Sequence, residues 1–178
     1  MKKIICALIL ISLVLCVASC SANNVEIPDG MQIVSPADVS YNFFVPGGWI
    51  PTENNGIFGA YYSNTDKSNM TVSSLYPSGE LMSISDYWTT LEESYKETFK
   101  NFTLIEAPEN NESNIIFGER GAFKYVFSAD IDGESYKMMQ ILTVEGSLFY
   151  TFTYTAKADL YESHLADVEK TITEFKFK

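Results

Sequence analysis

The chain has 178 residues, a formal net charge of −11 at pH 7 and an aromatic content of 14%. The excess of acidic side chains repels the phosphates of nucleic acids, so a nucleic-acid-binding function is not expected. All 3 cysteines lie within the first 20 residues, which excludes a disulfide inside the rest of the chain.

The first 19 residues are typical of a secretory signal peptide. Lys2 and Lys3 form a short positive region, and residues 4–18 are uncharged and largely apolar. This stretch is shorter than the roughly 20 apolar residues that a transmembrane helix needs. Removal of both lysines with the signal changes the formal charge of the chain from −11 to −13.

The residues Val17-Ala18-Ser19-Cys20 resemble the bacterial lipobox, in which an aliphatic and two small residues precede an invariant cysteine. The resemblance implies cleavage before Cys20 and attachment of diacylglycerol to its sulfur. The alternative is an ordinary secretory signal, because Val17 and Ser19 also suit the general signal peptidase. We expect a lipid-anchored protein on the extracytoplasmic face of a bacterial cell membrane of the Gram-positive type. Its membrane contact comes from the lipid and not from a polybasic patch.

Residues 20–37 are predicted to form a flexible tether, and residues 38–178 a single domain. The tether contains Asn, Pro, Gly and Asp with little periodicity. From Val39 onward the pattern is globular, with no second linker and no internal repeat. A domain of this size can bury a core without disulfides, because roughly two-thirds of its unfolded surface is lost on folding.

The first part of the domain is predicted to consist of strands. Residues 41–45 form one strand, which ends at Pro46-Gly47-Gly48 just before Trp49. Residues 57–63 and 70–76 are expected to pair as a hairpin across a polar connection.

Residues 83–99 are predicted to form a helix. Ser83 and Asp86 have the spacing of a capping box, in which each side chain bonds the backbone amide of the other residue. Apolar residues then recur at helical spacing, with Glu and Lys on the opposite side. They are Ile84, Tyr87, Trp88, Leu91, Tyr95 and Phe99.

The second half of the domain is predicted to be an antiparallel meander. After an edge strand expected over residues 102–107, the residues alternate between two faces over 122–129 and 148–155, and residues 136–144 return between them as the partner strand. Asp132-Gly133 and Gly146 supply the turns between these strands. A second helix from Asp159, with an apolar stripe, and a short strand over 173–178 complete the chain. One face of the meander is strongly aromatic and has to be covered, which the two helices can do.

This order of elements indicates an α+β fold, an antiparallel β-sheet flanked by helices on its faces. Three segments resemble the PsbP-like family: residues 41–49 (YNFFVPGGW), 118–125 (GERGAFKY) and 146–153 (GSLFYTFT). The resemblance covers about residues 39–178 and implies a PsbP-like α/β/α sandwich. It further implies a non-enzymatic role in binding or assembling larger protein complexes, and it supplies no catalytic residue and no cofactor.

The residues themselves favour no catalytic site. His164 is the only histidine, so a zinc site of the usual kind is not available, and we expect this side chain to be partly exposed on the last helix. The Gly-x-Ser-x-Gly pattern of a nucleophile elbow is missing from the sequence. The 23 acidic residues do not single out a pair suited to glycoside hydrolysis.

Asp130, Asp132 and Glu134 provide the one metal hypothesis, a weak calcium site. Three carboxylates in five residues around a glycine match the oxygen ligands that calcium favours. A strand follows at once, without the twelve-residue loop of an EF-hand, so a solvated hairpin turn is the alternative.

Trp49, Tyr61 and Tyr62 are the candidate binding surface. They lie near Gly47-Gly48, Gly56 and Gly59, where loops can open, and Tyr and Trp offer large contact areas at a low entropy cost. We therefore expect a membrane-anchored module that binds or assembles an envelope protein or complex. The alternatives are a carrier for a small molecule, peptide or glycan, and a carboxylate-based hydrolase.

Overall fold

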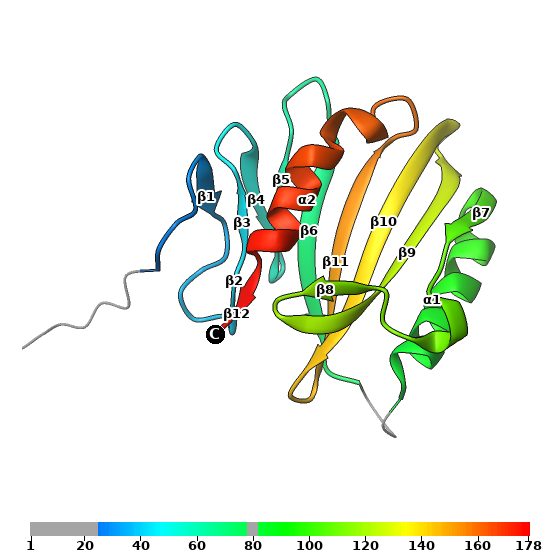
Figure 1. The fold of residues 1–178 in the computed structure, drawn as a ribbon. Helices are drawn as coiled ribbons and strands as arrows, with labels where there is room; N and C mark the ends of the chain where they lie inside the picture. The colour runs from blue at the N-terminus through cyan, green and yellow to red at the C-terminus, as the bar shows by residue number, and fades with distance from the viewer. Residues whose placement is uncertain (1–24, 78–81) are drawn as a thin grey trace, which may run out of the picture.

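The computed structural model describes residues 25–77 and 82–178, which form the domain drawn in Figure 1. The predicted signal peptide, Cys20 and the first part of the predicted tether lie outside these residues. No helix in the described ranges is long and apolar enough to cross a membrane.

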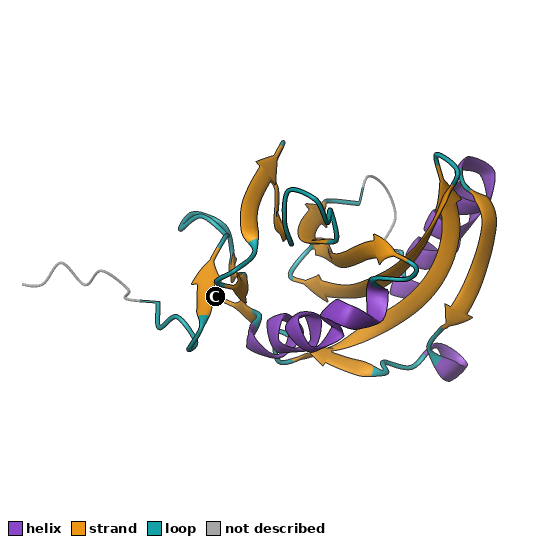
Figure 2. Ribbon diagram, turned by 90° about the horizontal axis from the view of Figure 1, so that it is seen from above, coloured by secondary structure: helices purple, strands orange, loops and turns teal. Residues whose placement is uncertain are grey.

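The centre of the fold is a strongly curved antiparallel sheet (Figures 1 and 2). Its spatial order is β4-β5-β6-β11-β10-β9-β7, and β8 pairs with the remaining part of β9. In that order the strands are β4 (Ile50–Asn54), β5 (Ile57–Tyr61), β6 (Asn69–Leu75), β11 (Leu148–Lys157), β10 (Glu134–Glu145), β9 (Arg120–Ile131), β7 (Lys100–Glu106) and β8 (Ile115–Phe117).

The predicted meander is confirmed by β9, β10 and β11. Asp132 and Gly133, between β9 and β10, have φ values of 53° and 86°. Two successive positive φ angles are typical of a type I′ turn, which matches the twist of the flanking strands. The next turn begins at Gly146, whose φ is 60°. The predicted hairpin of β5 and β6 and the edge position of β7 are also confirmed.

The helix α1 (Ile84–Thr98) covers one face of β9 and β10. The predicted capping box is present, because Ser83 Oγ accepts from the Asp86 amide at 3.1 Å and Asp86 Oδ2 accepts from the Ser83 amide at 3.4 Å. Trp88 is the buried residue of this helix, and its ring stacks on Tyr125 with centroids 3.8 Å apart. We call this cluster the α1 core; its buried members are Trp88, Tyr125, Phe127, Ala129, Met138 and Leu142.

The helix α2 (Leu165–Glu174) covers the opposite face, over the larger α2 core. Alternate residues of β9, such as Ala122 and Val126, belong to this core, as strand geometry requires. Phe175, just after α2, stacks on Phe117 of β8 at a centroid distance of 4.1 Å. The last helix begins later than predicted, because the chain first forms a 3₁₀ turn, η2 (Tyr161–His164), and not a cap at Asp159.

Both ends of the described chain are held in small two-stranded pairings. β1 (Met31–Ile33) pairs with β3 (Phe44–Pro46), and the C-terminal β12 (Lys176–Phe177) pairs with β2 (Tyr41–Asn42).

The boundary predicted at residue 38 is therefore too late. Met31 is buried, Ser35 Oγ accepts from the Phe43 amide at 2.9 Å, and Lys170 Nζ donates to the Asp29 carbonyl at 2.7 Å. Residues 29–37 thus belong to the domain, because their backbone and side chains bond to it.

Candidate binding surfaces

Trp49 is part of the core and does not contribute to an open aromatic surface. Its side chain is 2% exposed, and Nε1 donates to Asp167 Oδ2 in the first turn of α2 at 2.8 Å. Its ring also meets Tyr62 edge-on, with centroids 5.5 Å apart. The indole therefore ties the segment before β4 to α2, and the expectation of a surface tryptophan is corrected.

Tyr61 is the last residue of β5 and Tyr62 follows the strand, and the two side chains have different neighbours. Tyr61 packs under Lys67, whose Nζ lies 4.2 Å from the ring centroid. Tyr62 is 41% exposed and shares the face of Trp49. The three aromatic residues that the sequence brought together thus do not form one surface.

His164 is buried, with 7% exposure, and not partly exposed as expected. Its Nε2 lies 2.8 Å from Asp66 Oδ2, and its ring packs on Tyr62 with centroids 4.2 Å apart. This contact joins the end of η2 to the loop between β5 and β6. The sequence could not reveal the pair, because its two members are 98 residues apart.

The Asp66 carboxylate has several hydrogen-bond donors. Burial raises its pKa, but the bonds from Ser68 and the contact with His164 outweigh burial and hold the pKa below its ordinary value. Ser68 donates to Asp66 Oδ1 from its backbone amide at 2.9 Å and from its hydroxyl at 2.6 Å.

The Asp66–His164 pair resembles the base and orienting acid of a hydrolase triad, but its surroundings are those of a structural clamp. A triad needs a nucleophile that bonds to the histidine. The Ser68 hydroxyl donates to the carboxylate of Asp66, and no hydroxyl among the described hydrogen bonds bonds to His164. The pair therefore fixes a loop to the start of α2.

The three carboxylates of the calcium hypothesis do not converge. Asp130 accepts from Asn101 Nδ2 at 2.5 Å, and Glu134 pairs with Lys157 at 2.5 Å. Within residues 25–77 and 82–178, no group of three His, Cys, Asp or Glu side chains is placed to hold a metal ion. The structure therefore favours the alternative, a hairpin turn in which Asp130 and Glu134 have protein partners.

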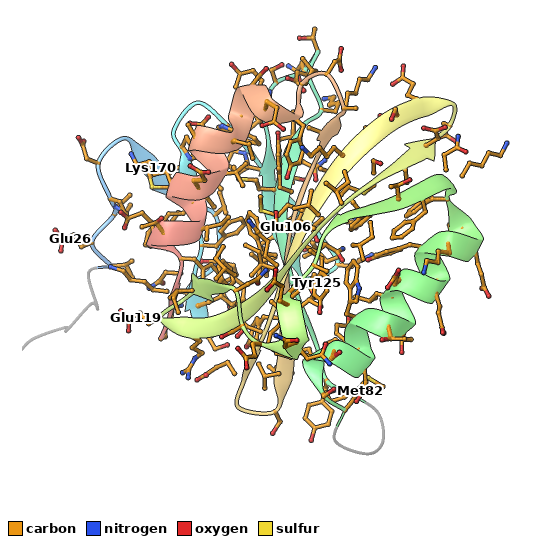
Figure 3. The ribbon with its side chains drawn as sticks, turned by 45° about the vertical axis from the view of Figure 1, so that its right-hand side comes forward. Glu26, Met82, Glu106, Glu119, Tyr125 and Lys170 are labelled. Atoms are coloured by element: carbon orange, nitrogen blue, oxygen red, sulfur yellow. The ribbon has the colours of Figure 1, made fainter. Side chains whose placement is uncertain are left out.

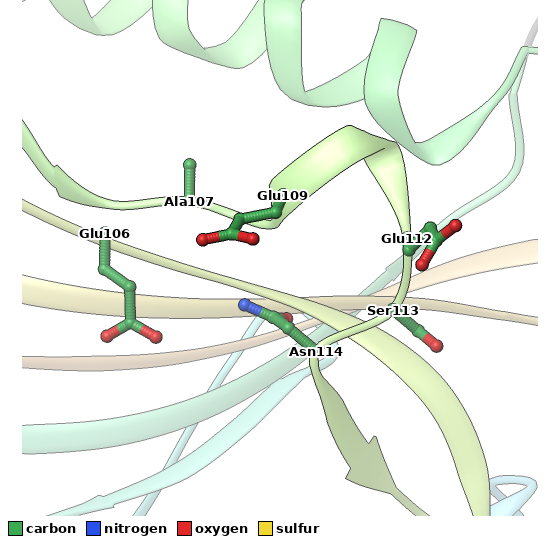
Figure 4. A pocket seen from close by; sticks show the side chains of 6 residues that line it. All are labelled: Glu106, Ala107, Glu109, Glu112, Ser113 and Asn114. Carbon is green, nitrogen blue, oxygen red and sulfur yellow. The ribbon is translucent and has the colours of Figure 1, made fainter.

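An acidic recess lies where the chain passes from β7 to β8 (Figure 4). It has a volume of about 370 Å³ and includes Glu106, Glu109 and Glu112. Glu106 is already paired with Lys124 Nζ at 2.8 Å. Asn114 accepts from the Lys124 amide at 2.8 Å, so the floor of the recess is held to β9. Nothing in the sequence pattern marks this irregular turn as a site.

Large apolar side chains are exposed at the end of the sheet near the start of α1, and we call them the apolar rim. Leu75 and Val144 are opposite Phe149 on either side, so all three share one face of the sheet. Tyr87 of α1 packs on Phe149 at a centroid distance of 4.9 Å, which places this face beneath the helix. Met82 lies beside the beginning of α1 (Figure 3). The rim consists of Leu75, Tyr76, Met82 and Val144, with exposed fractions of 48%, 69%, 42% and 38%.

The fold is similar to those of known PsbP-like structures. PsbP of the cyanobacterium Synechocystis sp. PCC 6803 (CyanoP) has a TM-score of 0.59 and 14% identity, and the match covers 91% of this chain and 99% of that one. LpqN of Mycobacterium tuberculosis, which is involved in cell envelope biogenesis, has a TM-score of 0.53 and 12% identity over 83% of this chain and 90% of its own. The Ran-binding protein Mog1p of Saccharomyces cerevisiae has a TM-score of 0.56 and 8% identity over 83% and 95%. No protein-family model and no curated protein matches the sequence. The predicted PsbP-like α+β fold is confirmed; at these identities the likeness concerns the fold alone.

Proposed function

We propose that the protein is a lipid-anchored module of the bacterial cell envelope that binds another protein without catalysing a reaction. The apolar rim carries this proposal. Leu75, Tyr76, Met82 and Val144 expose between 38% and 69% of their surface at one end of the sheet. A group of large apolar side chains that remains exposed in a folded domain is typical of a protein–protein contact.

The fold is consistent with such a role. One structure of similar fold belongs to a protein involved in cell envelope biogenesis, and another to a Ran-binding protein. For this chain, the expected partner is an envelope protein or complex with an apolar surface of its own. The acidic character of the chain, at −11 formal charge, favours partners that are not themselves strongly acidic.

Lipid attachment at Cys20 is the second part of the proposal. The lipobox-like residues Val17-Ala18-Ser19-Cys20 support it. The wild-type protein is expected in the membrane fraction, and the Cys20→Ala variant in the soluble extracytoplasmic fraction. Equal solubility of the two proteins would remove the anchoring proposal while leaving the partner proposal open to its own test.

The partner proposal is tested by photo-crosslinking in intact cells. A photoreactive amino acid replaces Val144 in the rim, and the matched control carries it at Ser63, a half-buried position in the loop after β5. We expect one discrete adduct from position 144 that is missing from the control and lost when Leu75 is changed to Ser. Identical adducts from both positions, or no adduct from position 144, contradict a partner at the rim.

The Leu75→Ser change needs a check of folding. Leu75 is 48% exposed, and substitutions at such surface positions usually change the free energy of unfolding by less than about 0.5 kcal/mol. An unchanged melting temperature for this variant ties a lost adduct to the contact and not to unfolding.

A further inference from the structure

An apolar groove lies at the point where the N-terminal segment enters the domain. It has a volume of about 680 Å³, within the range of roughly 300–1,000 Å³ that is usual for small-molecule sites. The N-terminal segment forms one wall, and the C-terminus and the segment around β2 form the other; Figures 1 and 2 place both ends of the described chain on the same side of the domain. Its lining includes Val25, Ile27, Ile33, Ala37, Asn42 and Lys178.

The walls of the groove have apolar surface to bury. Val25 and Ile27 are 38% and 48% exposed, although both line the groove. An apolar occupant that covers these side chains removes apolar surface from water, which favours its binding.

Lys178, the last residue of the sequence, places an ammonium group at one end of the groove, close to its own α-carboxylate. Lys178 Nζ donates to the carbonyls of Ala37 at 2.9 Å and Val39 at 2.8 Å. An ammonium has three N–H donors, so one remains for an acceptor on a ligand. An apolar channel with an ammonium donor at its edge suits an amphipathic ligand that has an alkyl chain and a phosphate in its head group.

The position of the groove along the chain identifies the source of such a ligand. Val25 follows Cys20 by five residues, and an extended chain spans at most about 3.6 Å per residue, or about 18 Å in total. If Cys20 carries the lipid of the proposed function, the groove stays within that distance of the bilayer surface. A short tether keeps the local concentration of bilayer lipids high, so even a site of modest affinity is occupied.

We propose that this groove binds one acyl chain of a phospholipid from the membrane to which the protein is anchored, with the phosphate of the lipid head group at the Lys178 ammonium. The inference rests on the anchoring part of the proposed function. Occupation of the groove turns the N-terminal side of the domain toward the bilayer. The partner-binding rim, built from the ends of β6 and β10 and the start of α1, is made of other residues and does not overlap the groove.

The proposal is tested with the full lipidated protein in vesicles of phosphatidylcholine and phosphatidylglycerol. A genetically encoded fluorescent amino acid replaces Ala37 in the groove, and a control protein carries it at Ser63. The vesicles contain a phospholipid with a nitroxide quencher either deep in the acyl chain or on the head group. We expect the deep nitroxide to quench position 37 strongly and position 63 hardly at all.

Two variants check that the groove is responsible. Ile33→Asp places a carboxylate in the apolar wall and is expected to abolish quenching by the deep nitroxide. Lys178→Gln removes the ammonium donor and is expected to weaken the apparent affinity for both phospholipids by about tenfold. The second variant remains informative if the first one folds poorly.

The alternative occupants give different outcomes. Quenching of position 37 by the head-group nitroxide alone means that the groove faces the membrane without taking a chain, and overturns the proposal. Quenching that occurs only after Cys20→Ala means that the protein's own acyl chain fills the groove, and also overturns it. If Cys20→Ala and wild type distribute identically between membrane and soluble fractions, the anchoring proposal fails. In that case, quenching of position 37 by the deep nitroxide at high lipid concentration still tests whether the groove binds an acyl chain, independently of the anchor.

Discussion

Gly59 is the position at which a single added carbon should damage the sheet. It lies within β5, directly opposite Thr71 of β6. A Cβ at Gly59 would overlap the carbonyl oxygen of Met70 and lie 2.8 Å from Thr71 Cγ2. The overlapping atom belongs to the backbone of the neighbouring strand, so it cannot move away without disturbing the β5–β6 ladder.

The expected cost of Gly59→Ala follows from this overlap. Overpacking of a close-packed site typically costs about 1–3 kcal/mol. For a domain of this size each kcal/mol lowers the melting temperature by about 2–4 °C, so the variant should melt about 2–12 °C below wild type. Thermal unfolding followed by circular dichroism measures the shift. Urea titration should show a lower midpoint with an unchanged slope.

Gly48→Ala is the matched control. A Cβ at Gly48 meets nothing within 4 Å, and the backbone there is not in the left-handed region. This variant should be as stable as wild type or more stable by up to about 1 kcal/mol, because alanine restricts the unfolded chain. If Gly59→Ala and Gly48→Ala unfold at the same temperature, the steric reasoning is refuted.

Three further substitutions test the packing of the two helices. Trp88→Ala should lower the free energy of unfolding by about 3–5 kcal/mol in urea titrations, because Trp88 is the buried residue of α1; a loss below 1 kcal/mol would mean that the helix is not held by this side chain. Trp49→Phe removes the bond to Asp167 and should cost about 1–3 kcal/mol by the same measurement, whereas an unchanged midpoint would show that the bond contributes nothing. Because the pKa of Asp66 is lowered in the folded protein, its ionised form stabilises the fold above the ordinary value of 3.8, and this contribution is lost as the pH falls below it. The stability difference between wild type and Asp66→Asn should therefore shrink between about pH 6 and about pH 3, and a constant difference would contradict the stabilisation of the ionised carboxylate by Ser68 and His164.

The long strands and α1 were predictable from local sequence. Apolar residues recur at helical spacing along α1, and the strands lie between residues that favour turns. β9 to β11 are rich in aromatic and β-branched residues, and the turn residues between them permit positive φ. β4 was missed because Ile50–Asn54 contains a proline and is mostly exposed, so it has no alternating apolar pattern. It is tolerated as an edge strand, where a missing backbone donor can face solvent. β1 was missed because its pairing with β3 depends on residues that follow it by more than ten positions.

The candidate site was harder to predict than the fold, because side-chain partners lie far apart in the sequence. The buried Trp49 side chain bonds to Asp167, which is 118 residues away in the sequence. The buried His164 side chain bonds to Asp66, which is 98 residues away. The local sequence pattern drew attention to Trp49 and His164, but it could not show which distant residues are their hydrogen-bond partners. The glycine at position 59, expected to open a loop, instead allows two strands to approach closely.

The paired C-terminus has a practical consequence for anyone who engineers this protein. The Lys178 amide donates to the Ser40 carbonyl at 2.9 Å, and Phe177 meets the ring of Tyr150 at 5.0 Å, so the last residues are locked into the domain. An affinity tag fused after Lys178 would emerge at the edge of the apolar groove and compete with whatever binds there.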